Sequence, residues 1–292
     1  METAGGRTIK LRDGRAIGFA EYGNPRGRPI LHMHGFPSSR FEGGHQALVE
    51  IACRLNARVF VIERPGIGNS DFRVLRSVAD WPATVAEFAD AVGLDHFILM
   101  GASAGGVYAL ACAEGLPRRT LAVGIISGLG PLDVPGSMDG MTPALRLLST
   151  AACRVPRSVP RLLAMLGSVA HAAPDLYNRV LAAGLSASDR AVLDRPGARS
   201  MFNAMLSGAL QAGSRGVAQD LKLLCESWKL KLGEIPVPVF LWHGEADRIV
   251  PPSHARYLAS AIPPSRVQFF SNEGHLSLIL CHWGEILSDL LG

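Results

Sequence analysis

Short apolar runs alternate with helical patterns over the first 130 residues. The runs have the length of buried strands, and the stretches between them repeat apolar residues at helical spacing. Such alternation is typical of parallel strands joined by right-handed helical crossovers. The sequence predicts strands at 30–33, 59–62, 97–100 and 121–127, and helices near 46–55, 83–92 and 106–114.

An antiparallel pair of strands is expected before this region. Segments 8–11 and 16–22 flank Asp13-Gly14, a dipeptide that favours a tight hairpin turn.

The alternation stops after residue 127, and the next clear strand begins at 237. Between them, apolar residues recur at helical spacing, with proline and glycine breaks, in 145–148, 162–169, 177–185 and 201–210. The chain therefore predicts a long helical insertion. After it we expect a strand at 237–242, a helix at 253–261, a strand at 267–270 and a closing helix at 276–291.

Composition narrows the class of protein. The 292 residues are 48% hydrophobic and carry a formal net charge of +4, with arginines scattered along the chain, so nucleic acid is not an expected partner. Five cysteines form no CxxC pair, which favours reduced thiols and a cytoplasmic location. No apolar run has the length of a membrane span or of a signal-peptide core, so no membrane partner is expected. Composition gives no indication of the oligomeric state.

The pentapeptide Gly101-Ala102-Ser103-Ala104-Gly105 lies between the apolar run 96–100 and the helical run 107–114. A strand, a turn of small residues and a helix are the context of the nucleophile-elbow motif G-x-S-x-G. The glycines leave room for so tight a turn. Ser103 is therefore a candidate nucleophile.

An acid and a histidine follow in the order of one serine-hydrolase architecture. Asp247 comes after the strand at 237–241, and His275 comes after the strand at 267–270. Glu245 and Asp133 are rival acids, and His282, His45, His96 and His254 have structural interpretations. A base is needed because a serine hydroxyl is a weak nucleophile, and the acid orients the imidazole.

Further segments carry a resemblance that extends over nearly the whole chain. They are His34-Gly35-Phe36-Pro37, the Arg-Pro-Gly segment within 63–71, and 243–251, in which Asp247 stands before Val250-Pro251. With the elbow, they make the chain similar to proteins of the α/β-hydrolase fold. This resemblance implies a mostly parallel central sheet with flanking helices, a core domain at 1–130 and 234–292, and a helical cap at 131–233 inserted after strand 6.

The resemblance also implies roles at the site. Ser103, Asp247 and His275 would be catalytic, the backbone N–H groups of Phe36 and Ala104 would form the oxyanion hole, and His34 and Gly35 would support the pocket. No cofactor or metal is needed, because no group of residues has metal-ligand spacing. The segment 64–71 lacks the lysine of a phosphate-binding loop and reads as structural.

These features predict a cofactor-independent serine hydrolase that cleaves an ester or related acyl bond. Leu, Met and Ala residues in the cap, such as Met201 and Met205, suggest a small, partly apolar substrate. Non-hydrolytic chemistry on the same fold, including acyl transfer, C–C bond cleavage, a lyase or a cyclase, is one alternative. A receptor-like ligand-binding protein is another. A serine at position 103 argues against dehalogenases and epoxide hydrolases, which need an aspartate there.

Overall fold

The computed structural model describes residues 6–75 and 77–292. These residues form an eight-stranded sheet in the order β1-β2-β4-β3-β5-β6-β7-β8. The first two strands form the expected antiparallel hairpin, and β2 pairs antiparallel with β4, whereas every later pairing is parallel. The predicted fold class, a mostly parallel sheet with flanking helices, is confirmed.

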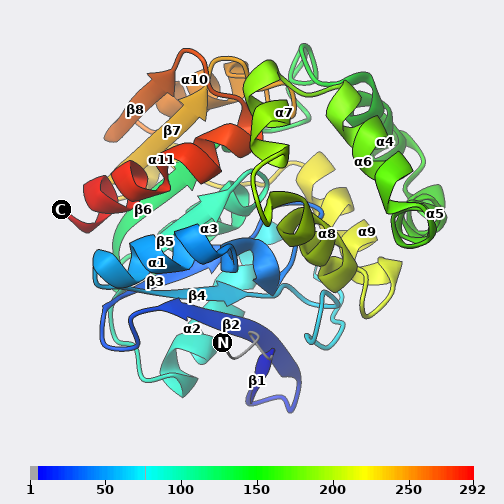
Figure 1. Cartoon of the computed structure of the whole chain (residues 1–292). Coiled ribbons are helices and arrows are strands. Elements are labelled where there is room, and N and C mark those ends of the chain that lie inside the picture. Colours follow the sequence, from blue (N-terminus) through cyan, green and yellow to red (C-terminus); the bar gives the residue numbers. More distant parts are fainter. Residues whose placement is uncertain (1–5, 76) are drawn as a thin grey trace.

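Helices cover both faces of the sheet (Figure 1). The strands are β1 (Arg7–Lys10), β2 (Ala16–Gly23), β3 (Arg28–Met33), β4 (Ala57–Ile62), β5 (Phe97–Ala102), β6 (Thr120–Ile126), β7 (Val239–Gly244) and β8 (Ser265–Phe270). The helices of the core are α1 (Gln46–Arg54), α2 (Trp81–Ala91), α3 (Gly105–Gly115), α10 (Ser253–Ala261) and α11 (His275–Leu291).

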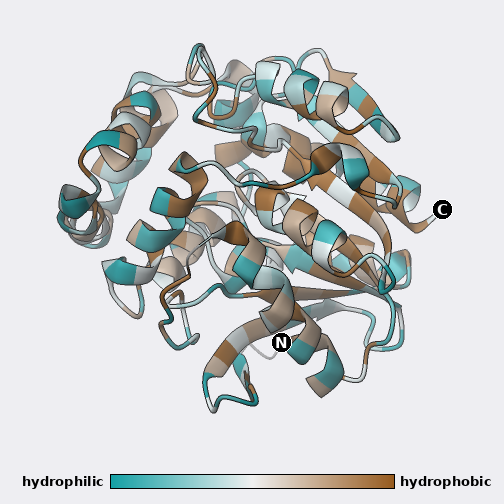
Figure 2. Ribbon diagram, turned by 180° about the vertical axis from the view of Figure 1, so that it is seen from behind, coloured by the Kyte–Doolittle hydropathy of each residue, from teal (hydrophilic) through white to brown (hydrophobic). Residues whose placement is uncertain are grey.

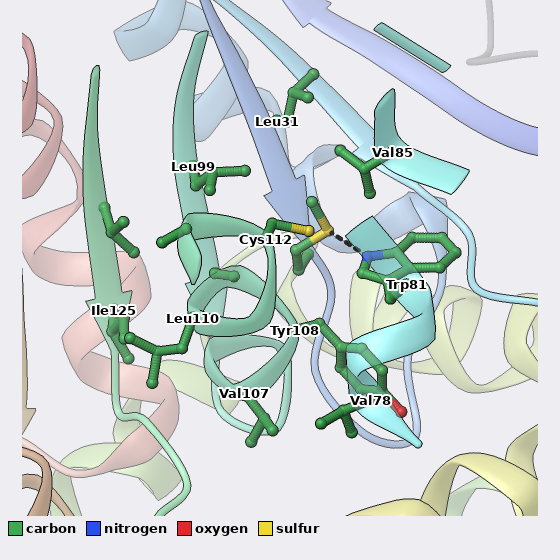
Figure 3. Close-up of a cluster of buried hydrophobic side chains, with 14 of the residues drawn as sticks. Leu31, Val78, Trp81, Val85, Leu99, Val107, Tyr108, Leu110, Cys112 and Ile125 are labelled. Carbon is green, nitrogen blue, oxygen red and sulfur yellow. Dashed lines mark hydrogen bonds between the residues drawn. The ribbon is translucent and has the colours of Figure 1, made fainter. Parts of the chain in front are cut away.

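The middle of the sheet is buried on both faces. Every residue of β5 is buried, as expected for a central parallel strand covered by helices on both sides. Trp81 of α2 donates its indole N–H to the sulfur of Met33 at 3.3 Å, and Tyr108 of α3 lies in the same cluster (Figure 3). In Figure 2 the central strands are mostly hydrophobic, whereas the helices alternate hydrophobic and hydrophilic faces. The carboxyl edge of β5 is thus held in a rigid core.

The long insertion between β6 and β7 is helical, as the sequence predicts. It contains α4 (Pro143–Arg154), α5 (Val159–Ala172), α6 (Pro174–Ala183), α7 (Ala187–Leu193), α8 (Ala198–Ala209) and α9 (Ser214–Cys225). We call α4–α6 the outer cap, because they lie along the edge of the molecule in Figure 1, and α7–α9 the inner cap. The domain limits at 130/131 and 233/234 stay a prediction.

Several boundaries differ from the sequence prediction by one to three residues. Strand β7 begins at Val239 and not at 237, because Pro238 has no N–H to donate to the sheet. Helix α11 begins at His275, one residue earlier than predicted, so the histidine lies in the first turn of a helix rather than in the preceding loop. The helices α7 and α9 were not predicted. No helix in the described part of the chain combines the length and the apolar character needed to cross a bilayer.

Candidate active site

Ser103 occupies a strained turn between β5 and α3. Its φ of +54° lies in the left-handed region, which residues other than glycine rarely adopt. Its N–H donates to the Ile126 carbonyl at 2.8 Å, and its own carbonyl accepts from the Leu129 N–H at 3.1 Å. The turn is therefore fastened to the end of β6, and Ser103 itself is 9% exposed. This is the geometry that the G-x-S-x-G motif predicts.

The two glycines of the motif allow close backbone packing. A Cβ atom added at Gly101 would lie 2.5 Å from the carbonyl oxygen of Gly105. One added at Gly105 would overlap the carbonyl oxygen of Met33, at the end of β3. Any larger residue would push the elbow away from the strand that leads to the His34-Gly35 segment.

His275 and Asp247 form a buried hydrogen-bonded pair. The Nδ1 atom of His275 lies 2.7 Å from Oδ2 of Asp247, so an ionised carboxylate accepts the Nδ1–H and leaves Nε2 as the acceptor. The other oxygen, Oδ1, accepts the N–H groups of Ile249 and Val250, both at 2.8 Å. One oxygen of the carboxylate is therefore held by its own loop, and the other holds the imidazole.

Ser103 lies at the same edge of the sheet as this pair. The chain enters the Ser103 turn from β5, and the loop that carries Asp247 follows β7, two strands away in a parallel arrangement. Within residues 6–75 and 77–292, no hydrogen bond joins the Ser103 hydroxyl to His275. Catalytic hydrogen bonds in free enzymes are often long and shorten when substrate binds.

The rival acids lie elsewhere. Glu245 is exposed and lies 3.4 Å from Arg256, and Asp133 is exposed beyond the end of β6. The other candidate histidines have surroundings that suit structural roles. His282 pairs with Glu273 and Glu285, His45 caps α1, His254 accepts the Gly130 N–H, and His96 is exposed.

The two buried histidines of the site have opposite electrostatics. Burial opposes protonation of His275, but the charge and hydrogen bond of Asp247 outweigh burial, and with smaller contributions from Asp189 and Glu42 the pKa of His275 is raised. Burial and the nearby Arg64 cation hold the pKa of His34 well below its usual range. His275 is therefore suited to accept a proton, whereas His34 stays neutral.

The Gly35–Phe36 peptide is held by its carbonyl. The His34 Nδ1–H and the Arg64 Nη2 both donate to the Gly35 oxygen, at 3.0 and 2.9 Å. The carbonyl and the N–H of one peptide point in opposite directions, so these bonds aim the Phe36 N–H away from Arg64. In the described part of the chain, neither the Phe36 N–H nor the Ala104 N–H has a hydrogen-bond acceptor. Both amides are free to bind an oxyanion.

Two carboxylates of the inner cap reach the site, and sequence reasoning missed both. Asp189 of α7 accepts hydrogen bonds from the first turn of α11, which carries His275. Asp220 of α9 pairs with Arg64 at 2.7 Å and accepts the Tyr108 hydroxyl. Asp189 follows Ser186 by three residues, a spacing that looks like ordinary helix capping, and Asp220 had no local signal at all.

The segment 64–71, for which we expect a structural role, is held by hydrogen bonds to the neighbouring residue Glu63. It folds around the buried Glu63, whose carboxylate accepts the Asn69 N–H at 2.8 Å, so the loop does not suit a phosphate. Within the described residues, no group of three or more His, Cys, Asp or Glu side chains could hold a metal ion.

A family model for the alpha/beta hydrolase fold matches residues 28–280. The chain belongs to this family. A dihydrolipoyllysine-residue acetyltransferase component of an acetoin cleaving system from Cupriavidus necator is 30% identical over 75% of the chain, and the chain spans about half of that relative (52%). A 2-hydroxy-6-oxo-2,4-heptadienoate hydrolase from Pseudomonas putida is 24% identical over 94% of the chain and 88% of its own length.

Solved structures show the same fold along the whole chain. A hydrolase from Pseudomonas aeruginosa has a TM-score of 0.73 at 17% identity, with 100% of both chains covered. An enol-lactonase from Burkholderia xenovorans has a TM-score of 0.72 at 17% identity, covering 98% of this chain and 99% of its own. An esterase from a Rhodococcus species has a TM-score of 0.70 at 19% identity, with 98% of both chains covered.

Proposed function

We propose that this α/β-hydrolase-fold protein is a serine hydrolase that cleaves an ester or a related acyl bond. The observation that carries the proposal is the buried Asp247–His275 pair, at the same sheet edge as the strained Ser103 turn. Two free backbone amides, those of Phe36 and Ala104, flank this turn. Among similar proteins of known structure, an esterase and an enol-lactonase both have names that denote cleavage of acyl–oxygen bonds.

The reaction follows from the roles these groups can take. His275 removes the Ser103 proton as the serine oxygen attacks the acyl carbon, and Asp247 stabilises the charged ring. The Phe36 and Ala104 amides bind the oxyanion of the tetrahedral intermediate, where each such donor is worth about 3 kcal/mol of barrier. His275 then protonates the leaving group, and water repeats the sequence to release the acid and restore Ser103.

A partly apolar substrate fits the surroundings of the oxyanion loop. The half-buried Phe36 packs against an apolar cluster of the core and also against the cluster inside the cap. Met201 is itself buried in the cap, which agrees with a packing role for that residue. Strong preference for short, highly charged acyl groups in a substrate panel would contradict this assignment.

Acyl transfer is the second candidate. One relative, the acetyltransferase component from Cupriavidus necator, matches three quarters of the chain. Ser103 is also nearly buried, and limited access of water to an acyl-serine favours transfer to another acceptor. The two reactions share every step up to the acyl-enzyme and differ only in the acceptor.

Hydrolysis of aryl esters tests the proposal. We expect Ser103→Ala to lower kcat by at least about 10⁴-fold, because the nucleophile is lost. Ser260→Ala, at an exposed serine of α10, is the matched control and should keep the wild-type rate. Equal turnover by wild type and Ser103→Ala would refute the proposed nucleophile. Added alcohols that divert product from acid to new ester would favour the transfer reaction.

A further inference from the structure

We propose that two buried carboxylates of the inner cap, Asp189 and Asp220, are positioning residues for the reaction. Asp189 holds the helix that carries His275, and Asp220 holds the arginine that orients the Phe36 amide. This inference rests on the proposed function, because positioning has a meaning only if Ser103, His275 and the Phe36 amide react together. It makes the cap a part of the catalytic machinery rather than only a cover.

Asp189 supplies the N-terminal cap of α11 from a distant segment. Its Oδ2 accepts the His275 N–H at 3.0 Å, and its Oδ1 accepts the N–H groups of Leu276 at 2.7 Å and Ser277 at 2.9 Å. These are donors that a helix leaves unsatisfied in its first turn, where a negative charge is also favourable. Asp189 is completely buried. His275 is thus held by its backbone through Asp189 and by its ring through Asp247.

Gly274 shows how close this contact is. A Cβ atom added at Gly274 would overlap Oδ2 of Asp189 and the Ser186 hydroxyl. The cap therefore approaches the chain directly before His275 to a distance that only glycine allows.

Asp220 acts through Arg64. The carboxylate accepts Arg64 Nε at 2.9 Å and Nη2 at 2.7 Å, a two-point contact that fixes the plane of the guanidinium. In this orientation Arg64 donates to the carbonyl oxygens of His34 at 2.6 Å and of Gly35 at 2.9 Å. Because the Gly35 carbonyl and the Phe36 N–H belong to one peptide, Asp220 indirectly sets the direction of that amide.

The two carboxylates should differ in one measurable respect. The ionisable groups that act most strongly on His275 include Asp247, Asp189 and Glu42, and His243 also interacts with it. Asp189 is one of the main groups that raise the pKa of His275, and Asp220 is not among them. Removal of the Asp189 charge should therefore move the acid limb of activity to lower pH, and removal of the Asp220 charge should leave it in place.

The test is the rate at which a fluorophosphonate labels Ser103 as a function of pH in wild type, Asp189→Asn and Asp220→Asn. We expect Asp189→Asn to slow labelling about tenfold or more, because the amide places a donor opposite the His275 N–H. It should also shift the acid limb to lower pH, because the negative charge of Asp189 is lost. Asp220→Asn should slow labelling without a shift. If Asp189→Asn were labelled at the wild-type rate and with the wild-type acid limb, the proposal would be overturned. If wild type itself were not labelled, the proposed function would be refuted.

Asp189→Glu keeps the test valid if Asp189→Asn does not fold. Glutamate retains the charge but is longer by one methylene, so the acid limb should stay near that of wild type while labelling slows. Wild-type labelling in Asp189→Glu would overturn the positioning role.

A separate observation concerns the outer cap. We infer that its exposed face binds the surface of a membrane that carries anionic lipid headgroups. This departs from the sequence-based expectation of no membrane partner, which rested on the lack of a spanning segment. The evidence is an unpaired cluster of arginines beside exposed apolar side chains.

The positive charge gathers where α4 meets α5. A cavity of ≈ 450 Å³ is lined by Arg154, Val155, Pro156, Arg157, Ser158 and Arg161. Within residues 6–75 and 77–292, none of these three arginines forms an ion pair. The sequence from 140 to 174 contains no aspartate or glutamate. We call Arg154, Arg157 and Arg161 the arginine face, and its charge lacks a partner in the described chain.

Large apolar side chains accompany this charge. Leu147 is 71% exposed, Met165 59% and Val155 56%. Further exposed residues of the same kind in the outer cap are Val169, Leu176 and Val180. On α5, Met165 and Val169 follow Arg161 at intervals of four residues, so these three side chains share one face of the helix. Arginine and aliphatic side chains on one helical face are typical of helices that lie in the headgroup region of a bilayer. Each cation near an anionic leaflet adds to the attraction.

Two other occupants fit less well. A second copy of the same face would bring the two arginine clusters together, and like charges repel. An acidic protein would satisfy the arginines, but protein interfaces concentrate their apolar anchors near one centre, whereas the exposed apolar side chains of the outer cap are spread over three helices.

Sedimentation with vesicles tests this inference. Wild type should bind vesicles that contain phosphatidylcholine and phosphatidylglycerol. It should not bind vesicles of phosphatidylcholine alone, and it should bind neither kind of vesicle at high salt. Arg154→Gln/Arg157→Gln/Arg161→Gln should weaken binding about a hundredfold, the order expected for three cations near an anionic surface. The matched control is Arg26→Gln/Arg118→Gln/Arg266→Gln. These three arginines are exposed and lie outside the cap, so this variant should bind vesicles as wild type does.

Other results would overturn the inference. Equal loss of binding in both triple variants would mean that net charge, not the arginine face, attracts the vesicle. No vesicle binding, with inorganic phosphate bound by wild type and not by the outer-cap variant, would assign the cavity to a soluble anion. Polyglutamate that binds this face more tightly than the vesicles do would assign it to an acidic protein.

Discussion

The inner and outer halves of the cap differ in how they use charge. The inner cap directs buried carboxylates into the core, where Asp189 and Asp220 are completely paired with backbone N–H groups, Arg64 and Tyr108. The outer cap exposes arginines and large apolar side chains to solvent. Buried paired charges fix geometry, whereas exposed unpaired charges remain available to a partner. We therefore expect substitutions in the inner half to affect the proposed reaction, and substitutions in the outer half to affect the proposed membrane binding.

The largest expected effect lies in the inner cap. Asp220→Ala should lower the free energy of unfolding by about 3–5 kcal/mol, because it leaves the buried Arg64 without its counterion. Asp175→Ala in the outer cap, an exposed carboxylate, should stay within about 0.5 kcal/mol of wild type. Urea unfolding of both variants gives the two numbers. Similar losses in the two variants would remove the distinction between the halves.

A pair of leucines sharpens the comparison within the outer cap. Leu163 of α5 is 1% exposed and belongs to the cluster that joins the outer cap to α8 and α9. Leu163→Ala should lower the free energy of unfolding by about 2–5 kcal/mol through loss of buried apolar volume. Leu147→Ala, at a largely exposed position, should change it by less than about 0.5 kcal/mol. If thermal unfolding gave equal losses, the exposed face would have to be packed in solution.

The pH dependence of activity should respond to changes in the inner cap, through Asp189, and not to changes in the outer cap. The base must be neutral, so activity should fall about tenfold per pH unit below the raised pKa of His275, with an acid limb above pH 6.5. The sign is opposite for stability. Because the pKa of His275 is higher in the folded than in the unfolded state, its protonation stabilises the fold. This stabilisation is complete below the unfolded-state pKa and is lost as the pH rises through the folded-state pKa. A pH–rate profile with its acid limb at or below pH 6.5 would contradict this assignment. The arginine-face variant should share the wild-type profile.

The smallest effect is expected at an exposed ion pair of the outer cap. Arg146 and Asp139 lie 3.7 Å apart with side chains that are mostly exposed. Arg146→Gln should change the free energy of unfolding by less than about 0.5 kcal/mol, since solvent screens such pairs. A loss above 1 kcal/mol in denaturant unfolding would show that outer-cap charges also carry structure.

Local patterns were sufficient to predict the core. The hairpin, the β5 strand with its elbow at Ser103 and the order of acid and histidine all follow from short motifs, and the structure has them in place. The contacts of Asp189 and Asp220 join residues 86–88 and 156 positions apart, and no local pattern encodes such pairs. Helix α7 has only seven residues, and α9 follows a glycine-rich break, so periodicity indicated neither.

Covalent labelling tests the central claim most directly. A fluorophosphonate reacts only with an activated serine, and intact mass counts the adducts. Wild type should gain one adduct, Ser103→Ala should gain none, and His275→Ala should react far more slowly or not at all. An adduct of equal yield on Ser103→Ala, or no adduct on wild type, would contradict the assignment of Ser103 as a nucleophile activated by His275.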